Sequence, residues 1–136
     1  MTILRGITLN MTKTKKPTAS ETDEQITVIE YCDIKNIPIY HIANEGKRTK
    51  YTGDLLKRMG MRKGFPDLCV PVARGKFHGF YIEMKSASGK PTNDQISWLK
   101  RLKAQGYATA ICYGSQEAIT LIEKYLQLGE KENGES

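Results

Sequence analysis

The sequence predicts a single α/β domain of three layers, in which helices flank a mixed central sheet. Its 136 residues suffice for one hydrophobic core and are too few for two. Two apolar runs, one after Pro66 and one from Phe77 to Lys85, have the composition of strands, and Gly75 lies in the turn between them. A helical pattern separates the second run from a third, and a helix that joins two neighbouring strands makes them parallel. The sheet is therefore expected to hold both antiparallel and parallel pairs.

The first element is predicted to be a helix that follows a basic arm. Residues 1–19 carry four basic residues and no acidic one, with threonine-rich sequence from Thr12, and we expect a mobile arm there. Ser20 can cap a helix through Asp23 at the third position, and the helix is expected to reach about Lys35. Its inward stripe is predicted to be Ile26, Ile29 and either Val28 or Cys32.

A short strand from Ile37 to Ile42, entered through Pro38, is expected next. Within it, His41 is expected to be packed or hydrogen-bonded rather than catalytic. A loop through Gly46 and a basic helix from about Gly53 to Met59 then lead to the two strands that carry the predicted site.

The run from Phe77 to Lys85 alternates as a half-buried strand does. One face carries Tyr81, Glu83 and Lys85, and the other carries Phe80, Ile82 and Met84. Glu83 and Lys85 therefore point the same way. The sequence Arg74-Gly75-Lys76 predicts a hairpin turn, so this strand and the one after Pro66 are expected to be antiparallel neighbours.

The last third of the chain predicts helix, strand and helix. Thr92-Asn93-Asp94-Gln95 is a capping box that starts a helix to Gln105, and Gly106 is placed to end it in a left-handed conformation. We expect the buried stripe of this helix to be Ile96, Leu99 and Leu102, with Trp98 in packing. A strand from Tyr107 to Tyr113, a helix from Ser115 to Leu126 and a polar tail over 129–136 complete the chain; the domain itself spans 20–128.

Two carboxylates and a lysine predict metal-dependent cleavage of phosphodiesters. If Asp67, at the start of its strand, turns toward Glu83, the two can hold one or two Mg²⁺ or Mn²⁺ ions against a phosphate, assisted by a backbone carbonyl near Met84. Lys85 would then lie near the attacking water or the phosphoryl oxygens. The alternative is an edge strand with solvated charges. A second Glu-X-Lys triplet, Glu45-Gly46-Lys47, has no strand pattern around it and is interpreted as coincidental.

Two further positions can support this site, and each has a purely structural alternative. Glu21 or Glu24, in the first helical turn, can contribute a carboxylate, or can be a surface acid favoured by the helix dipole. Gln95 can reach back to the Thr92 amide, as a capping box does, or can hydrogen-bond a metal-bound water or a phosphate at the amino end of its helix.

The positive charge is concentrated before Asp67. The chain has a net charge of +6, and the segment 47–63 holds seven basic residues against one acidic residue, a local excess of six. We expect this segment to bind a nucleic-acid backbone, and the alternative is a solvated helix face. The predicted contacts are Lys47, Arg48, Lys50, Arg62 and Lys63.

The cysteine pattern and the absence of an apolar span predict a cytoplasmic protein. Cys32, Cys69 and Cys112 are far apart, each in an apolar run, which favours buried free thiols over disulfides or a zinc site. No stretch is long and apolar enough for a membrane span or a signal peptide.

Several motifs together resemble one family. Gly64–Pro71, His78–Lys85, Gly89-Lys90, and Gln95 with Trp98-Leu99 closely resemble the VRR-NUC family, a branch of the PD-(D/E)XK nucleases. The resemblance covers about Ser20 to Leu126 and implies a restriction-endonuclease-like fold. Its pattern is a first-helix glutamate, for which it slightly favours Glu21, then Gly-X-Pro-Asp, Glu-X-Lys and a glutamine. Asn44-Glu45-Gly46 departs from the Asn-Gly-Gly of many relatives.

The resemblance also implies an activity. Stand-alone members are typically phage-borne and act as homodimers on branched DNA, so it implies a Mg²⁺- or Mn²⁺-dependent endodeoxyribonuclease that resolves four-way (Holliday) junctions, in the host cytoplasm if phage-encoded. The alternatives are a nuclease for flaps or other branched DNA, a non-catalytic basic DNA-binding module, and a small-molecule phosphoesterase. The dimer interface is predicted on the apolar residues of the basic helix, which are Tyr51, Leu55, Leu56 and Met59.

Overall fold

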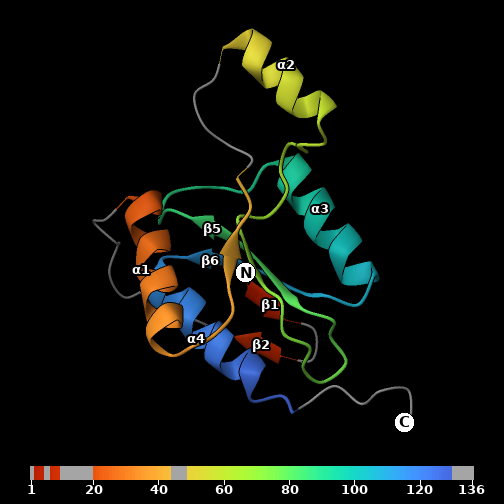
Figure 1. Cartoon of the computed structure of the whole chain (residues 1–136). Helices are drawn as coiled ribbons and strands as arrows, with labels where there is room; N and C mark the ends of the chain where they lie inside the picture. Colours follow the sequence, from red (N-terminus) through yellow and green to blue (C-terminus); the bar gives the residue numbers. More distant parts are fainter. Residues whose placement is uncertain (1, 5–6, 10–19, 44–48, 130–136) are drawn as a thin grey trace.

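A four-stranded mixed sheet forms the centre of the molecule. It is seen in a computed structural model that describes residues 2–4, 7–9, 20–43 and 49–129 (Figure 1). The strand order is β3-β4-β5-β6, with antiparallel pairing from β3 to β5 and parallel pairing between β5 and β6. The bounds are Tyr40–His41 for β3, Leu68–Val70 for β4, Phe80–Lys85 for β5 and Ala108–Tyr113 for β6. The predicted mixed sheet is confirmed.

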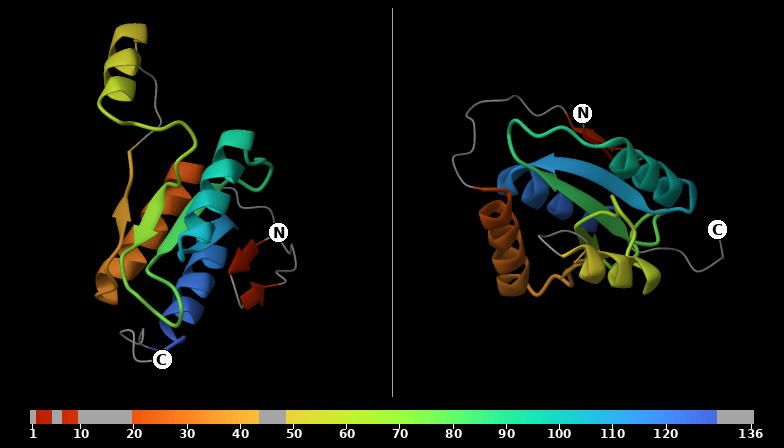
Figure 2. Two further views of the ribbon diagram at one scale, coloured as in Figure 1. Left: turned by 90° about the vertical axis from the view of Figure 1, so that its right-hand side faces the viewer. Right: turned by 90° about the horizontal axis from the view of Figure 1, so that it is seen from above.

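Helices lie on both faces of this sheet, which gives the three predicted layers (Figures 1 and 2). α1 (Glu21–Ile34) and α4 (Ser115–Leu126) cover the face that carries Phe80, Ile82 and Met84, all fully buried. α3 (Asn93–Ala104) lies on the opposite face, which carries Glu83. Each large apolar side chain buried in the main core contributes about 1.5–3 kcal/mol to the free energy of folding.

α1 begins as predicted and buries a different stripe. The Ser20 hydroxyl accepts a hydrogen bond from the Asp23 amide at 3.1 Å, which caps the helix. Val28 and Cys32 are fully buried, whereas Ile26 is 49% exposed, so the prediction for Ile26 was wrong. Since each residue turns the helix by about 100°, Ile26 lies about 200° from Val28 and faces solvent.

The β4–β5 hairpin turns at Gly75, as predicted. Arg74 and Phe77 form an isolated antiparallel bridge, and Gly75 adopts a φ of 55°, a left-handed conformation that glycine adopts without strain. β5 begins at Phe80 rather than at Phe77.

The elements after the hairpin also agree with the sequence patterns. The Thr92 capping box is formed, Gly106 ends α3 with a φ of 92°, and β6 runs parallel to β5. On α3, Leu99 is buried, while Ile96 and Leu102 are half-buried. α4 has the predicted bounds.

Two segments differ from their predicted form. Only Tyr40–His41 of the expected strand 37–42 pairs as a strand, because Pro38 has no amide to donate to a ladder; Ile37 and Ile39 pack partly buried against the core instead. α2 (Lys50–Arg58) begins three residues before the predicted helix, capped by Thr49, and projects from the sheet without a buried side chain (Figure 1).

Within the segment expected to form an arm, the structure has two short strands. β1 (Thr2–Leu4) and β2 (Ile7–Leu9) pair as an antiparallel hairpin, and β1 lies beside β6. The three cysteines are buried free thiols, as predicted. Among the residues described, no helix has the length and apolar character that crossing a membrane requires.

Candidate active site

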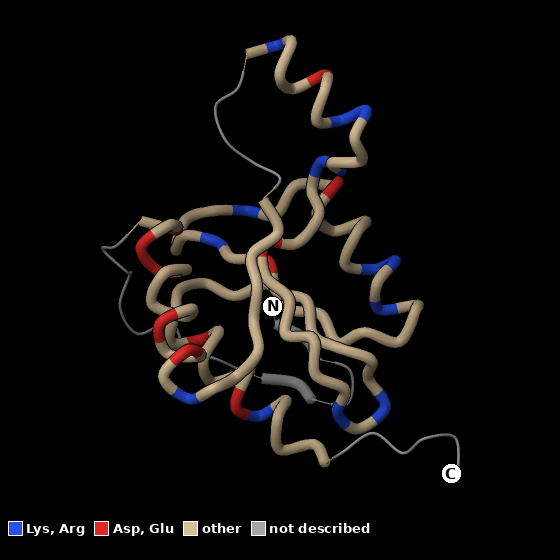
Figure 3. The backbone as a smooth tube through the Cα atoms, viewed as in Figure 1, with Lys and Arg blue, Asp and Glu red and all other residues tan. Residues whose placement is uncertain are grey.

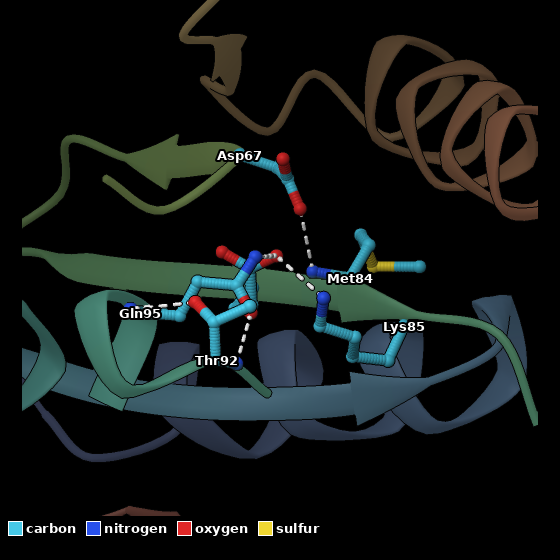
Figure 4. Close-up of polar contacts among 6 residues, drawn as sticks. Asp67, Met84, Lys85, Thr92 and Gln95 are labelled. Atoms are coloured by element: carbon cyan, nitrogen blue, oxygen red, sulfur yellow. Dashed lines mark hydrogen bonds and ion pairs between the residues drawn. The ribbon is translucent and has the colours of Figure 1, made fainter. Parts of the chain in front are cut away.

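Asp67 and Glu83 face each other across two antiparallel strands. Leu68 pairs with Ile82, so the next positions along the ladder, Asp67 and Glu83, are opposite one another and share one face. Both are buried, with exposures of 5% and 1%. Asp67 Oδ2 accepts a hydrogen bond from the Met84 amide at 2.8 Å, which ties its carboxylate to β5 (Figure 4).

Lys85 lies on the same face as Glu83, as the strand alternation predicted. Its Nζ is 3.8 Å from Glu83 Oε2, and its side chain is only 12% exposed (Figure 4). A buried carboxylate costs free energy unless charges or hydrogen bonds compensate it. The ammonium of Lys85 supplies part of that compensation and holds a positive charge beside the carboxylate pair.

Gln95 forms the predicted capping box and also contacts Glu83, while its predicted bond to a metal-bound water or a phosphate stays a prediction. Its side-chain Oε1 accepts a hydrogen bond from the Thr92 backbone amide at 2.9 Å. Its backbone amide donates to the Thr92 hydroxyl at 3.2 Å, which completes the capping box. At the same time its Nε2 donates to Glu83 Oε2 at 3.2 Å (Figure 4). A primary amide has an acceptor end and a donor end, so one side chain can fix the helix start and orient the carboxylate.

Gly64 brings the segment before Asp67 against the start of α3. A Cβ atom on this residue would lie 2.7 Å from the Asp94 carbonyl carbon and 2.8 Å from the Gln95 nitrogen. Its φ of 84° is also a conformation that other residues rarely adopt. Glycine is therefore needed here on two counts, and it sets the spacing between Asp67 and Gln95.

The two glutamates of the first helical turn have different surroundings. Glu24 Oε2 accepts from the Ser115 amide at 2.6 Å and so caps α4, whose own N-cap, Gly114, has no side chain to do this. Glu21 is half-buried. Among the described residues no three His, Cys, Asp or Glu side chains form a metal-binding cluster, so a metal role for either glutamate stays a prediction.

His41 is hydrogen-bonded, as expected, but its contact with the Asp67 backbone was not predicted from the sequence. Its Nδ1 is 2.9 Å from the Asp67 carbonyl oxygen and 3.1 Å from Gln25 Nε2. The available signal was its place on the strand that pairs with β4. His78 packs against the Tyr107 ring, with 5.7 Å between the ring centroids.

The donor set suits a hard divalent cation. Asp67 and Glu83 supply carboxylate oxygens, and Mg²⁺ is commonly bound through one or two carboxylates together with waters and substrate phosphates. The predicted phosphate contacts lie nearby in the chain: Lys50 and Arg62 are exposed, and Lys63 pairs with Asp94 at 3.8 Å. Lys47 and Arg48 lie outside the described residues, as does the coincidental triplet at 45–47.

An α/β domain with two facing carboxylates and an adjacent lysine has the arrangement expected of a nuclease fold. Comparison with known proteins agrees with this class. The model of the VRR-NUC domain family matches residues 47–116, and the chain belongs to the VRR-NUC family of nucleases.

A solved structure of a VRR-NUC domain protein superposes with a TM-score of 0.74 at 26% sequence identity. The match covers 84% of this chain and 93% of that chain. No curated protein matches the sequence.

Proposed function

We propose that this protein is a Mg²⁺- or Mn²⁺-dependent endonuclease that hydrolyses phosphodiester bonds in branched DNA, with four-way (Holliday) junctions as its substrate. The observation that carries the proposal is the Asp67–Glu83 pair on facing strands, with the Lys85 ammonium 3.8 Å from Glu83. A non-catalytic DNA-binding module would have no use for a buried carboxylate pair, since burying these charges costs folding free energy.

In the proposed mechanism Asp67 and Glu83 would hold the cation, assisted by the Met84 carbonyl and by Glu21. When bound, the ion lowers the pKa of a coordinated water and neutralises charge on the scissile phosphate. Lys85 orients the attacking water and stabilises the negative charge that develops on the phosphoryl oxygens. Gln95 fixes the Glu83 carboxylate through the 3.2 Å hydrogen bond. Because water is the proposed nucleophile, no covalent intermediate with the protein is required.

Basic residues before the site are proposed to bind the DNA backbone. Lys50 and Arg62 are exposed, and Lys63 is paired only with the exposed Asp94. An exposed pair of this kind contributes little and can be exchanged for a phosphate. Lys47 and Arg48 belong to the same proposed surface.

We further propose that the protein is a homodimer, in which two sites make the two cuts that a four-way junction needs. α2 supports this because its apolar side is exposed: Tyr51 by 79%, Leu55 by 39% and Met59 by 72%, next to the half-buried Leu56. A two-fold dimer would cover this side and place two sites in matching orientation. The residues 20–128 are proposed to be the nuclease domain, acting in the cytoplasm.

The proposal is tested by incubating the protein with single strands, duplexes, flaps and four-way junctions in Mg²⁺, in Mn²⁺ and in EDTA. We expect metal-dependent, paired and symmetric nicks in junctions. If the protein cleaves flaps and leaves four-way junctions intact, its specificity is for flaps and not for junctions. Binding of DNA without cleavage in either metal would refute the enzymatic proposal.

A further inference from the structure

α3 carries a second basic surface, distinct from the segment 47–63. Its only acidic residue, Asp94, is in the first turn, whereas Lys100, Arg101 and Lys103 are exposed near its other end. Figure 3 shows basic positions along α3 as well as along α2. In the part of the chain that the structure describes, the ion pairs are Lys63–Asp94 and Lys85–Glu83, so these three cations have no carboxylate partner.

Arg101 rests on Trp98, an aromatic side chain that packs against the segment carrying the site. Its guanidinium carbon lies 4.0 Å from the centroid of the Trp98 ring, a cation–π contact. Trp98 packs edge-on against Phe65 at 5.0 Å, and Phe65 packs against Tyr81 at 5.5 Å. Phe65 is two residues before Asp67. The guanidinium is therefore ordered on an aromatic support while its N–H groups stay available to an anion.

The distances of these basic residues from Gln95, along the axis of α3, can be compared with the spacing of phosphates in DNA. Gln95, at the start of the helix, donates to Glu83. At 1.5 Å per residue, Arg101 and Lys103 lie about 9 and 12 Å further along the axis. One DNA strand carries a phosphate about every 3.4 Å of duplex axis, so these distances correspond to about three or four phosphates.

A simpler explanation is that basic residues favour the last turn of a helix. That preference accounts for the presence of one cation at the end of the helix. It does not account for three cations without a carboxylate partner, or for the contact of Arg101 with Trp98, which packs against Phe65 beside the site. It is also satisfied elsewhere by Lys124 on α4, which lies on the other face of the sheet and so serves as a control.

We propose that the exposed side of α3, with Lys100 between Arg101 on one flank and Lys103 on the other, is a phosphate-binding surface for the DNA strand about three to four phosphates from the cleaved bond. The inference rests on the proposed nuclease function and extends it. The substrate would contact the protein on two sides of the site, along the segment 47–63 and along α3.

The test measures affinity for a labelled four-way junction and a plain duplex against salt concentration, without divalent ions. Lys100→Glu/Lys103→Glu should weaken binding at least about tenfold and reduce the slope of log affinity against log salt by about two. The matched control, Lys35→Glu/Lys124→Glu, changes the net charge equally on exposed residues of the α1–α4 layer and should leave the slope unchanged. Equal slopes in the two variants would overturn the inference.

Three further measurements keep the inference testable if the charge-reversed variant does not fold or if the proposed nuclease activity fails. If the charge-reversed variant does not fold by circular dichroism, Lys100→Gln/Lys103→Gln should show the same loss of slope. A neutral methylphosphonate three or four positions from the cleaved bond should weaken binding by wild type and not by the Lys100→Gln/Lys103→Gln variant. Wild-type cleavage, measured in parallel, separates failure of this inference from failure of the nuclease proposal.

Discussion

At the scale of single residues, the two carboxylates differ in how they are held. Asp67 accepts from a backbone amide, at 2.8 Å, whereas Glu83 accepts from Gln95 and pairs with Lys85. Truncating Glu83 to alanine would leave Lys85 buried without its carboxylate, so loss of activity could be confused with misfolding. Amide substitutions reduce this problem, because they remove the negative charge but keep the side-chain shape and an acceptor oxygen.

We expect Asp67→Asn and Glu83→Gln each to lower the cleavage rate at least about 100-fold, because the charge proposed to bind the cation is lost while the fold is kept. Junction affinity and thermal midpoint should stay close to wild type. Cleavage is measured under single-turnover conditions in Mg²⁺, with circular dichroism as the control for folding. Cleavage by Asp67→Asn at the wild-type rate would remove Asp67 from the site.

Cys32 provides a prediction on pH. Burial against the core raises the pKa of its thiol from 9.0 to about 11, first through desolvation and then through the nearby Asp33. Because the pKa is higher in the folded state, the stabilisation is complete below pH 9 and is lost as the pH rises through 11, by roughly 2 kcal/mol for this group. Urea unfolding of wild type and Cys32→Ala at pH 8 and pH 11 should show a smaller pH dependence in the variant; equal dependence would contradict this.

At the scale of elements, the site depends on how the segment before β4 meets α3. Gly64→Ala would place a methyl group 2.7 Å from Asp94 and would strain a backbone with a φ of 84°. We expect a loss of about 1–3 kcal/mol in unfolding free energy and a lower turnover rate, since Asp67 and Gln95 would move apart. Gly53→Ala is the matched control.

Gly53 is inside α2 and has open space around its Cα. Its replacement by alanine should therefore stabilise the helix, by up to about 1 kcal/mol, without changing cleavage. The two variants are compared by urea unfolding and by turnover on the same junction. A Gly64→Ala variant with wild-type stability and rate would show that the close approach does not set the geometry of the site.

The basic segment before the site supports a second prediction at this scale. Lys50→Glu/Arg62→Glu should weaken binding to every DNA shape to a similar extent and flatten the salt dependence by about two units of slope, one for each lost phosphate contact. Affinities for single strands, duplexes and junctions are measured by fluorescence anisotropy. An unchanged slope would mean that these residues are only a solvated surface.

At the scale of the whole molecule, α2 has no buried side chain and exposes an apolar side. Sedimentation at micromolar concentration should give a mass near twice 15.3 kDa. Leu55→Glu/Met59→Glu should give a monomer, since these side chains are exposed in the single chain and are proposed to be buried in the dimer. That monomer should nick one strand of a junction instead of making paired cuts.

Ile34→Glu is the control for this experiment, because Ile34 is 79% exposed on α1 and outside the proposed interface. It should sediment as wild type does. A wild-type monomer that still makes paired cuts would contradict the dimer, and would leave the assignment of the site to Asp67 and Glu83 untouched.

Much of the fold was determined by local sequence alone. The capping box at Thr92, the hairpin glycine at Gly75 and the left-handed glycine at Gly106 act within a few residues, so their structures are visible in the sequence. The alternation of β5 likewise places Glu83 and Lys85 on one face, because the side-chain period of a strand is two. The motifs that carry the family resemblance are also local.

Only the tertiary structure decided how the separate segments meet. The capping of α4 by Glu24 joins positions 91 residues apart, and the contact between His41 and the Asp67 carbonyl joins two strands. The hydrogen bond from Gln95 to Glu83 depends on the distance between α3 and β5, and at 3.2 Å it is formed in addition to the capping box. Ile26 faces solvent because α4 and the sheet pack on the other side of α1. Such contacts depend on packing between elements, which local patterns do not encode.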